Sequence, residues 1–250
     1  MKSLRLAAVL ATLATPLHHA GAGENIGVGA KPVDGAELII DGSREMLDEK
    51  WTYWEGPRFS SALPIKWKIV EDPIDGGTAV QTDDPAAKGG KYGTADIVTK
   101  KKYRDFRLHI EFLIPNKGGN SGVYLQNRYE IQIESPKAKK NIADPYNWKI
   151  GPHGIGAFCM EHVPDTNAWR PNGEWQSFHF VFKAATWDGD KPVEPARATV
   201  WWNGVKIHDN VPIKKANGGE KVSPTPEGLK LQEHGQDVRF RNIWIVDKSK

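Results

Sequence analysis

Short segments in which apolar and polar residues alternate recur along the chain, and they predict β-strands. In residues 106–114, Leu108, Ile110 and Phe112 alternate with polar or charged residues. Successive side chains of a strand point to opposite faces, so a period of two gives each strand one apolar and one polar face. The same pattern is found in residues 121–126, 129–134, 178–182, 198–202, 229–231 and 238–243. The pattern therefore predicts an all-β protein.

Turn-forming residues separate these segments, and no long helix competes with them. Gly, Pro, Asn and Asp recur roughly every ten residues. Only Met46–Trp54 suggests a short helix or turn. Many short strands between such turns are typical of a sandwich or barrel. Because we find neither an internal repeat nor a low-complexity linker, we predict that residues 23–250 form a single β-sandwich domain.

The first 22 residues have the pattern of a signal peptide. Lys2 and Arg5 form a basic start, an apolar stretch follows from Leu6 to Leu17, and residues 20–22 are small, as a signal peptidase requires. The apolar stretch is shorter than the roughly 20 residues of a membrane-spanning helix. No cysteine lies near the cleavage point to carry a lipid. We therefore expect a periplasmic or secreted protein without a membrane anchor.

Charge and cysteine content narrow the partners and the sources of stability. The formal net charge is +3, and loss of Lys2 and Arg5 with the signal peptide leaves +1. Acidic and basic residues are interspersed, so no nucleic-acid partner is expected. The single cysteine, Cys159, excludes an intramolecular disulfide. Stability must then come from the hydrophobic core, and the sequence identifies no protein partner.

One segment, at about residues 135–173, predicts a long loop, because it is rich in Pro, Gly and Asn. Such long insertions in compact domains are usually either functional or disordered. The segment carries Trp148 and Trp169, and Trp175 follows it. An indole ring at this place either stacks on the apolar face of a pyranose or only holds the loop down. Trp148 and Trp169 are therefore candidate sugar-binding residues.

The polar faces of several strands carry residues suited to sugar chemistry. Glu130, Gln132 and Glu134 form a row on one face of residues 129–134, about 13 Å long. Neighbouring polar faces carry His109, Glu111, Tyr124, Gln126, Gln232, His234, Arg239 and Arg241. Such groups bind hydroxyls and move protons. The outer face of an antiparallel sheet is normally polar, but Lys, which usually fills a plain solvent face, is absent from residues 124–134.

The spacing of Glu130 and Glu134 suggests one specific chemistry. A retaining glycosidase needs two carboxyl groups about 5–5.5 Å apart, and the pattern resembles the Glu-x-Asp-x-Glu of laminarinase-type sandwich enzymes. Gln132 stands in place of the central Asp, however, which weakens this interpretation. The sequence has no Gly-rich phosphate loop, no Gly-x-Ser-x-Gly elbow and no His-Glu-x-x-His helix. Cys159 fits a small buried residue better than a nucleophile.

A series of motifs in a fixed order covers most of the chain, from about Ala36 to Val246. The motifs are Tyr103-Arg104-Asp105-Phe106 with Glu111-Phe112, Gly119-Asn120-Ser121-Gly122-Val123-Tyr124-Leu125, Tyr129-Glu130-Ile131-Gln132-Ile133, Gly156-Ala157-Phe158, Pro171-Asn172-Gly173-Glu174-Trp175, Trp202-Asn203-Gly204, Leu231-Gln232-Glu233-His234-Gly235 and Val238-Arg239-Phe240-Arg241-Asn242-Ile243. In this order they resemble the 3-keto-disaccharide hydrolase domain family.

The resemblance implies a concanavalin-like jelly roll, in which two antiparallel sheets pack together. It also implies activity on glycosides that are already oxidised at C3 of the sugar. This chain departs from the family in its opening strand, which reads Leu38-Ile39-Ile40-Asp41-Gly42 where the family usually has Leu-Phe-Asn-Gly, and at three further positions. Gln126 stands where the family usually has Arg, and Glu134 and Glu233 stand where it has Asp. These departures bear on fine substrate specificity more than on the fold.

The implied chemistry assigns roles to the polar residues. A ketone at C3 makes the C2 proton acidic, so a base can remove it, and the enolate can then expel the C1 substituent before water adds back. A neutral imidazole suits the base near pH 7, and a carboxyl group can serve as base or acid. The candidate catalytic residues are therefore His109, His234, Glu130 and Glu111. The candidate substrate-binding residues are Gln132, Glu134, Gln126, Tyr124, Asn120, Arg241, Trp148 and Trp169.

We therefore predict an exported enzyme that cleaves 3-keto-glycosides by C2 proton abstraction, followed by β-elimination or hydrolysis at C1. The expected partner is a carbohydrate substrate. No cofactor and no metal site are predicted; the alternative is a divalent ion that polarises the ketone, with His109, Glu111, Glu130 and His234 as ligands. Two other functions stay open, namely a retaining glycosidase of laminarinase-like type and a non-catalytic carbohydrate-binding module.

Overall fold

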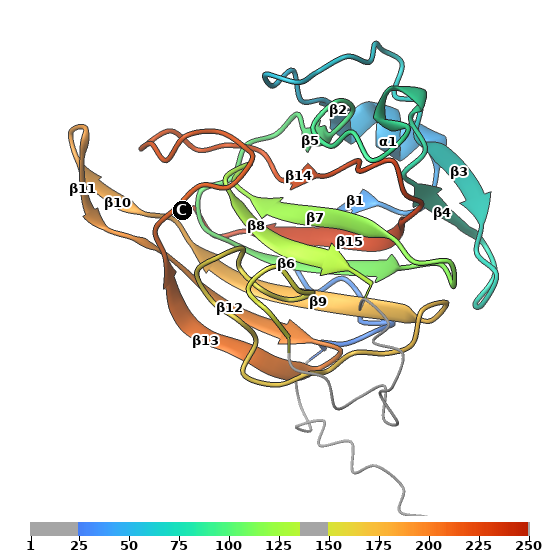
Figure 1. Ribbon diagram of the computed structural model, residues 1–250. Helices are drawn as coiled ribbons and strands as arrows, with labels where there is room; N and C mark the ends of the chain where they lie inside the picture. The colour runs from blue at the N-terminus through green and yellow to red at the C-terminus, as the bar shows by residue number, and fades with distance from the viewer. Residues whose placement is uncertain (1–24, 136–149, 250) are drawn as a thin grey trace, which may run out of the picture.

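The computed structural model describes residues 25–135 and 150–249, and most of its strands belong to two packed antiparallel sheets (Figure 1). The predicted signal peptide, residues 1–22, lies outside the described residues. So do Trp148 and the first part of the predicted long loop, residues 136–149. Within the described residues, no helix is long and apolar enough to cross a membrane.

The larger sheet has eight strands. They are β1 (Glu37–Ile40), β3 (Lys68–Glu71), β4 (Thr78–Gln81), β6 (Phe106–Leu113), β9 (Trp175–Lys183), β12 (Ala196–Trp202), β13 (Val205–Ile213) and β15 (Arg239–Asp247). Their order is β13–β12–β9–β6–β15–β4–β3, and β1 pairs with β15 as well. Strands far apart in the sequence are therefore neighbours, as in a jelly roll.

The smaller sheet has five strands. They are β2 (Trp51–Tyr53), β5 (Ile97–Thr99), β14 (Lys230–Leu231), β7 (Asn120–Leu125) and β8 (Tyr129–Glu134), in that order across the sheet. A hairpin of β10 (Thr186–Asp188) and β11 (Lys191–Glu194) projects from the body of the sandwich (Figure 1). The helices are short, α1 (Arg44–Lys50) and the 3-10 turn η1 (Pro85–Ala87).

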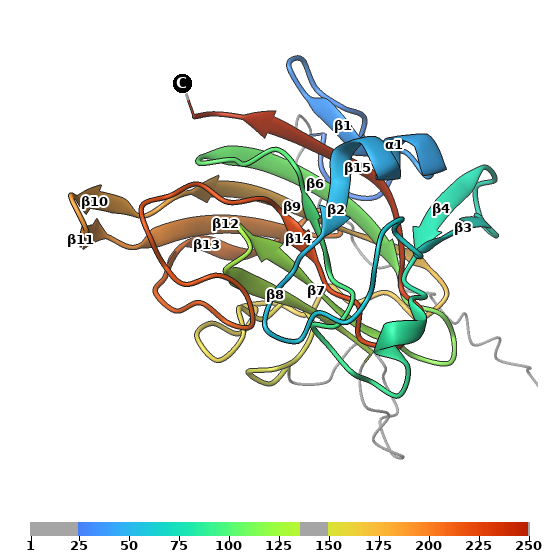
Figure 2. The ribbon, with the colours of Figure 1, turned by 90° about the horizontal axis from the view of Figure 1, so that it is seen from above.

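The core lies between the two sheets, which Figure 2 shows as layers seen from above. The apolar positions of the alternating pattern supply it. Ile110 of β6 and Phe180 of β9 are fully buried, as are Val123 of β7 and Ile131 of β8. Each such side chain contributes about 1.5–3 kcal/mol relative to an exposed position. The alternation therefore fixes which face of each strand looks outward.

The predicted all-β sandwich is confirmed, and every segment predicted as a strand overlaps a strand of the structure. The suggestion of a short helix or turn over Met46–Trp54 is half right. Ser43 caps α1 by accepting a hydrogen bond from the Met46 amide, and the helix ends at Lys50. Trp51, with the extended backbone typical of a strand, begins β2.

The described end of the long loop is packed along β8. The Gln132 amide donates to the Ala157 carbonyl at 3.0 Å, and the Gly156 amide donates to the Gln132 carbonyl at 2.9 Å. The Cys159 amide donates to the Glu130 carbonyl at 3.3 Å. Residues 156–159 thus cover the outer edge of β8 and bring Cys159 next to Glu130. This edge is where the candidate site begins.

Candidate active site

A cavity of about 590 Å³ opens on the outer face of the five-stranded sheet, a size typical of sites for small ligands. Its floor is formed by Asn120, Tyr124, Glu130, Gln132, Gln232 and His234, which come from β7, β8 and the chain after β14. Its walls include Trp54, Arg58, Tyr92, His153, Cys159 and Asn217. The polar row of β8 and the polar positions of its neighbours therefore meet in one hollow.

The strand register explains why Glu130 has room in this floor. Tyr124 pairs with Glu130 and Gly122 pairs with Gln132 across β7 and β8. A Cβ atom on Gly122 would lie 2.5 Å from the Glu130 Oε1 atom. A side chain at residue 122 would therefore displace the carboxyl group, and the missing side chain leaves the space that Glu130 occupies.

Glu130 is a nearly buried carboxyl group, with 6% of its surface exposed. Asn217 donates a hydrogen bond from Nδ2 to its Oε2 atom, and the Tyr124 hydroxyl bonds to it as well. Burial is the largest influence and raises the pKa of Glu130 to about 7, while these hydrogen bonds and the positive charge of Lys230 act in the opposite direction. Glu130 can therefore both take and give a proton near neutral pH.

Lys230 forms a fully buried ion pair beneath the cavity. Its Nζ atom lies 2.9 Å from Asp96, and it sits 3.6 Å from the Tyr124 ring centre and 4.1 Å from that of Trp54. It also donates to the Gly218 carbonyl at 2.8 Å, next to Asn217. The pair therefore fixes the Tyr124 ring and the loop that contacts Glu130, and it places a positive charge behind the site.

Amide groups line the floor beyond Glu130. The Gln132 Nε2 atom donates to Asn120 Oδ1 at 3.1 Å. Gln232 Nε2 donates to the Tyr124 hydroxyl at 2.9 Å. Among the described residues, the Nδ2 atom of Asn120 has no hydrogen-bond partner, although Asn120 lines the cavity. It is therefore available to donate to a sugar oxygen.

Two imidazole rings border the cavity. His234 stacks on Tyr92, with ring centres 5.5 Å apart and planes 11° apart, and its buried Nδ1 atom has no partner within the described residues. His153 places Nδ1 3.3 Å from Cys159 Sγ. Burial, with the adjacent Glu130 carboxyl, raises the pKa of the Cys159 thiol to about 11. Cys159 is therefore a neutral thiol rather than a reactive thiolate.

The structure brings together Glu130, Gln132, Tyr124, Asn120 and His234 of the predicted site residues. The expectation that His109, Glu111 and Arg241 share their cleft is wrong. These three residues lie on β6 and β15, on the outer face of the eight-stranded sheet, with the core between them and the cavity. The period of two shows that a side chain points away from the core, but it does not show to which sheet the strand belongs.

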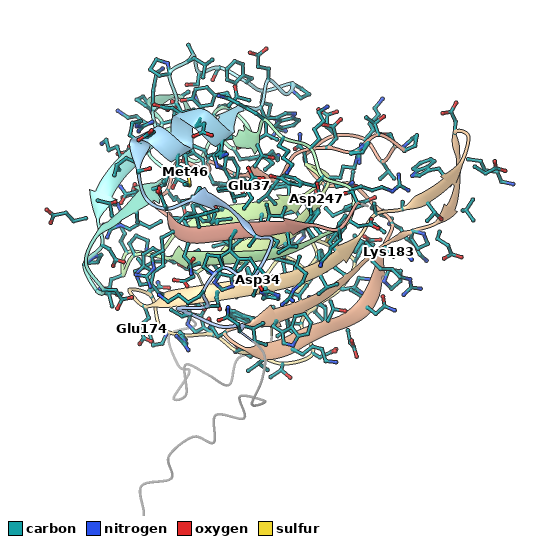
Figure 3. The ribbon with its side chains drawn as sticks, turned by 180° about the vertical axis from the view of Figure 1, so that it is seen from behind. Asp34, Glu37, Met46, Glu174, Lys183 and Asp247 are labelled. Atoms are coloured by element: carbon teal, nitrogen blue, oxygen red, sulfur yellow. The ribbon has the colours of Figure 1, made fainter. Side chains whose placement is uncertain are left out.

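On that face the polar residues bind one another beneath the N-terminal segment. Glu111 accepts from Arg241 at 2.9 Å and from the Gly29 amide at 2.7 Å, and it lies 3.3 Å from His109. Arg241 also pairs with Asp72. Figure 3 looks onto this face, where the segment that carries Asp34 crosses the sheet. These residues thus anchor the N-terminal segment instead of lining a cavity.

Two predicted substrate-binding residues have structural roles instead. Gln126 lies in the turn after β7, where it donates to the Tyr103 carbonyl at 2.9 Å and accepts from Arg128 at 3.2 Å. Both polar atoms of its side chain are therefore bound within the protein. Trp169 is 6% exposed and packs edge-on against Trp202 in the core, with ring centres 6.2 Å apart. The indole thus holds the loop down, which was the second of the two predicted roles.

Glu134 lines a neighbouring hollow with Asn120. The four ligands proposed for a divalent ion are divided between the two sheets, so they do not form one site. Among the described residues, no group of three or more His, Cys, Asp or Glu side chains is arranged to hold a metal ion.

The sequence-based prediction missed several cavity residues. Lys230, which lies beneath the cavity, carried the same signal as Glu130, because it is the polar position between the buried residues Leu229 and Leu231. Trp54, Tyr92, His153 and Asn217 reach the cavity from loops or from the end of a short strand. Loop residues have no periodicity, so no comparable signal was present for them.

Comparison with known proteins gives consistent relationships. The 3-keto-alpha-glucoside-1,2-lyase-like domain family matches this chain over residues 35–246. A 3-keto-disaccharide hydrolase from Bacteroides thetaiotaomicron is 25% identical over 255 residues, which is 86% of this chain and 82% of the relative.

Solved structures agree with this result. A crystal structure from Parabacteroides distasonis, assigned as a glycosyl hydrolase, has a TM-score of 0.62 at 26% identity and covers 86% of this chain and 84% of its own. A second structure from that organism with the same assignment has a TM-score of 0.55 at 21% identity, over 85% of this chain and 94% of its own. At 21% identity, this second match shows a similarity of fold alone.

Proposed function

The chain belongs to the 3-keto-alpha-glucoside-1,2-lyase-like domain family, and we propose that it is an enzyme that cleaves glycosides oxidised at C3 of the sugar. The observation that carries the proposal is the buried Glu130 carboxyl group on the floor of a ligand-sized cavity, with a pKa raised to about 7. A general base is most effective when its pKa lies near the working pH. The name of the Bacteroides relative supports the same substrate class.

In the first step, ionised Glu130 removes the proton from C2 of the bound 3-keto sugar. The electron pair of the C2–H bond forms the C2=C3 double bond, and the C3 oxygen becomes an enolate. The free Nδ2 donor of Asn120, which lines the cavity, favours negative charge on the C3 oxygen. Gln132 keeps Asn120 in place, because its Nε2 atom donates to the Asn120 side chain.

In the second step, the C3 ketone forms again. The electron pair of the C2=C3 bond moves to form a C1=C2 double bond, and the C1–O bond breaks. The leaving oxygen needs a proton, which we assign to His234, because His234 lines the same cavity as Glu130. Addition of water across C1=C2 then gives the hydrolysis product. The hydroxyl group bonds to C1, the other proton of the water restores His234, and Glu130, after exchange of its proton with solvent, protonates C2. Release before water enters gives the lyase product.

The retaining glycosidase is less compatible with the geometry. Glu130 and Glu134 are four residues apart on the straight strand β8, which separates their backbones by about 13 Å. A retaining pair needs about 5–5.5 Å between its carboxyl groups. The two side chains also line different hollows. A non-catalytic binding module stays the third interpretation, because a sugar-sized cavity alone serves binding as well.

The test is incubation of the purified protein with 3-keto-glucosides and, in parallel, with the unoxidised parent glucosides, followed by NMR of the products. We expect turnover of the keto compounds alone. Turnover of the parents with retention at C1 would overturn the proposal in favour of the glycosidase. Saturable binding of the keto compounds without turnover would favour the binding module.

We also propose that the protein is exported after removal of residues 1–22, on the sequence pattern given above. Expression of the full chain with determination of the N-terminus tests this. A mature chain that begins near Gly23 in the periplasm or medium is the expected result, and an uncleaved chain confined to the cytoplasm would contradict it.

A further inference from the structure

A loop of residues 214–229 joins β13 to β14 and forms part of the wall of the candidate active site. Asn217, Gly218 and Gly219 of this loop line the cavity, and Asn217 donates a hydrogen bond to the Glu130 carboxyl group. Most of the loop is exposed or half-buried. Because a loop has no hydrogen-bond ladder of its own, contacts with the body of the protein must fix the position of Asn217.

Arg128, which is not among the residues that line the cavity, binds this loop along most of its length. Its Nε atom donates to the Lys221 carbonyl at 2.7 Å. Its Nη2 atom donates to the Ser223 hydroxyl at 2.7 Å and to the Thr225 carbonyl at 2.8 Å. Its own carbonyl accepts from the Asn217 amide at 2.9 Å. One residue therefore holds the loop from Asn217 to Thr225.

The turn between β7 and β8 explains why Arg128 reaches the loop. Gln126 and Asn127, which precede it, have φ angles of 51° and 49°, the left-handed backbone of a tight hairpin turn. The Asn127 carbonyl accepts from the Glu220 amide at 2.6 Å. A Cβ atom on Gly219 would lie only 1.9 Å from the same carbonyl oxygen. The missing side chain at residue 219 therefore lets the loop pack directly against the turn.

The burial of Arg128 depends on these contacts. Its side chain lies in a residue that is only 2% exposed, and within the described residues its guanidinium group has no ion pair. Three of its four hydrogen bonds go to the loop, and the fourth goes to Gln126. A buried charge without a paired carboxylate requires such hydrogen bonds. The loop thus offsets the cost of burying Arg128, and Arg128 in turn fixes the loop.

Asn217 connects this arrangement to the proposed base. Its hydrogen bond lowers the pKa of Glu130 against the larger, opposite effect of burial. The titratable or charged groups around Glu130 come from other segments, and they are Tyr124, Cys159, His153, Lys230 and Asp96. The charged residues of the loop next to Asn217, Glu220 and Lys221, are exposed. The loop therefore acts on Glu130 through Asn217.

We propose that Arg128 is a positioning residue of the candidate active site, which holds residues 217–225 so that Asn217 keeps its hydrogen bond to Glu130. This inference rests on the proposed function, in which Glu130 is the base. When the loop is released, Asn217 is no longer held against the carboxylate, and Glu130 ionises at higher pH. Arg128 thus affects proton transfer without touching the substrate.

The experiment measures two midpoints in wild type and in Arg128→Met. Carbon-13 NMR follows the titration of the Glu130 carboxyl group, assigned with Glu130→Gln, and steady-state kinetics give the pH profile of kcat/KM for a 3-keto-glycoside. Both midpoints should move to higher pH by about one unit in Arg128→Met. Below pH 6, kcat/KM should then fall about tenfold, and above pH 9 it should stay close to that of wild type.

The two measurements separate the possible failures. Unmoved midpoints, with a loss of kcat/KM that is equal at all pH values, would overturn the inference, because Arg128 would then support the fold alone. Absence of turnover with every 3-keto compound would contradict the proposed function. The NMR titration needs no turnover, so it would still decide whether Arg128 acts on Glu130.

Further variants locate the effect. Asn217→Ala should give the same shift, and the double variant with Arg128→Met should shift no further than Asn217→Ala alone, because both changes act through one hydrogen bond. Additive shifts would contradict the inference. Arg241→Met removes a guanidinium group from the other sheet and is the matched control, which should leave both midpoints in place.

A second loop variant keeps the test decisive if Arg128→Met does not fold. Gly219→Ala retains Arg128 and Asn217, but its Cβ atom must push the loop away from the Asn127 carbonyl. We expect the midpoint of Glu130 to move to higher pH in this variant as well. An unmoved midpoint would overturn the inference, since the position of the loop would then not matter to Glu130.

Discussion

Two buried glutamates on the two outer faces of the sandwich have opposite environments. Glu130 of the five-stranded sheet and Glu111 of the eight-stranded sheet are 6% and 1% exposed. Burial raises the pKa of Glu130 to about 7, and its hydrogen bonds do not offset this. Burial also acts to raise the pKa of Glu111, but hydrogen bonds from His109, Asn242, Gly29 and Arg241 outweigh it and lower the pKa.

The difference teaches how a polar strand face becomes either an anchor or a site. On the larger sheet the N-terminal segment covers Glu111, and the guanidinium of Arg241 compensates its charge. On the smaller sheet Asp96 compensates the positive charge of Lys230 in an ion pair. A cavity stays open above Glu130. A compensated carboxylate stabilises the fold, whereas an uncompensated one is poised to exchange protons.

The two glutamates should differ most in their effect on activity, and this is tested by removing each carboxylate in turn. Glu130→Gln should lower kcat/KM for a 3-keto-glycoside by about 10²–10⁴-fold, because the amide cannot accept the C2 proton. Glu111→Gln is the matched control on the other sheet and should leave kcat/KM almost unchanged at a temperature where it is folded. Steady-state kinetics of the two variants measure this. A large loss in Glu111→Gln with little loss in Glu130→Gln would reverse the assignment.

The same pair of variants should differ in stability in the opposite sense. Glu111→Gln should lose about 3 kcal/mol of unfolding free energy at pH 7, since removal of one partner leaves a buried charge network incomplete. Because the folded-state pKa of Glu111 is lowered, its contribution is present above its unfolded pKa and is lost as the pH falls through the folded value. Urea unfolding at several pH values measures this. A loss no greater than that of the exposed Glu194→Gln would contradict it.

Glu130→Gln, in contrast, should stabilise the protein at high pH. The folded-state pKa of Glu130 is raised from 4.5 to about 7, so its contribution to stability is fully present below pH 4.5 and is lost as the pH rises through 7. The variant avoids burying a charge and should gain roughly 3 kcal/mol over wild type well above pH 7, with no gain below pH 4.5. The same urea titrations show this. A variant that is less stable than wild type at pH 9 would be inconsistent with the raised pKa.

The smallest expected effect concerns Lys230. Its charge lowers the pKa of Glu130, so Lys230→Met should raise that pKa further. In wild type, kcat/KM should rise with pH through about 7 as Glu130 ionises; in Lys230→Met this rise should move to higher pH by about one unit. Lys230→Arg should restore the wild-type profile. If the profile of Lys230→Met keeps its position, Lys230 acts on packing alone.

The alternating pattern predicted the all-β class and central strands of both sheets, but it did not predict other strands, including the nine-residue β13. Phe106–Leu113 and Tyr129–Glu134 show a clear period of two, and both strands agree with the predicted bounds to within one residue. The short strand Trp51–Tyr53 was missed because three residues show no periodicity. The pattern also gave the outward positions correctly, including Glu111 and Glu130.

The site could be predicted only in part, and for a physical reason. Sheet membership depends on hydrogen bonds between strands distant in sequence, such as β6 with β15, so alternation could not show that His109 and His234 lie on different sheets. Gln126 is hydrogen-bonded within a turn and Trp169 is packed in the core, and both arrangements likewise depend on tertiary contacts. The residues that were accessible from the sequence lie on the strands beside Glu130 or, like His234, shortly after the end of one.

The central claim is that Glu130 removes a proton from C2, and the most direct test follows that proton. The enzyme cleaves a 3-keto-glycoside in D₂O, and NMR measures deuterium at C2 of the 3-keto sugar released, corrected with authentic 3-keto sugar for spontaneous exchange. We predict one deuterium at C2 with wild type, and neither turnover nor enzyme-dependent exchange with Glu130→Gln. Cleavage by wild type that leaves the original hydrogen at C2 would contradict the account.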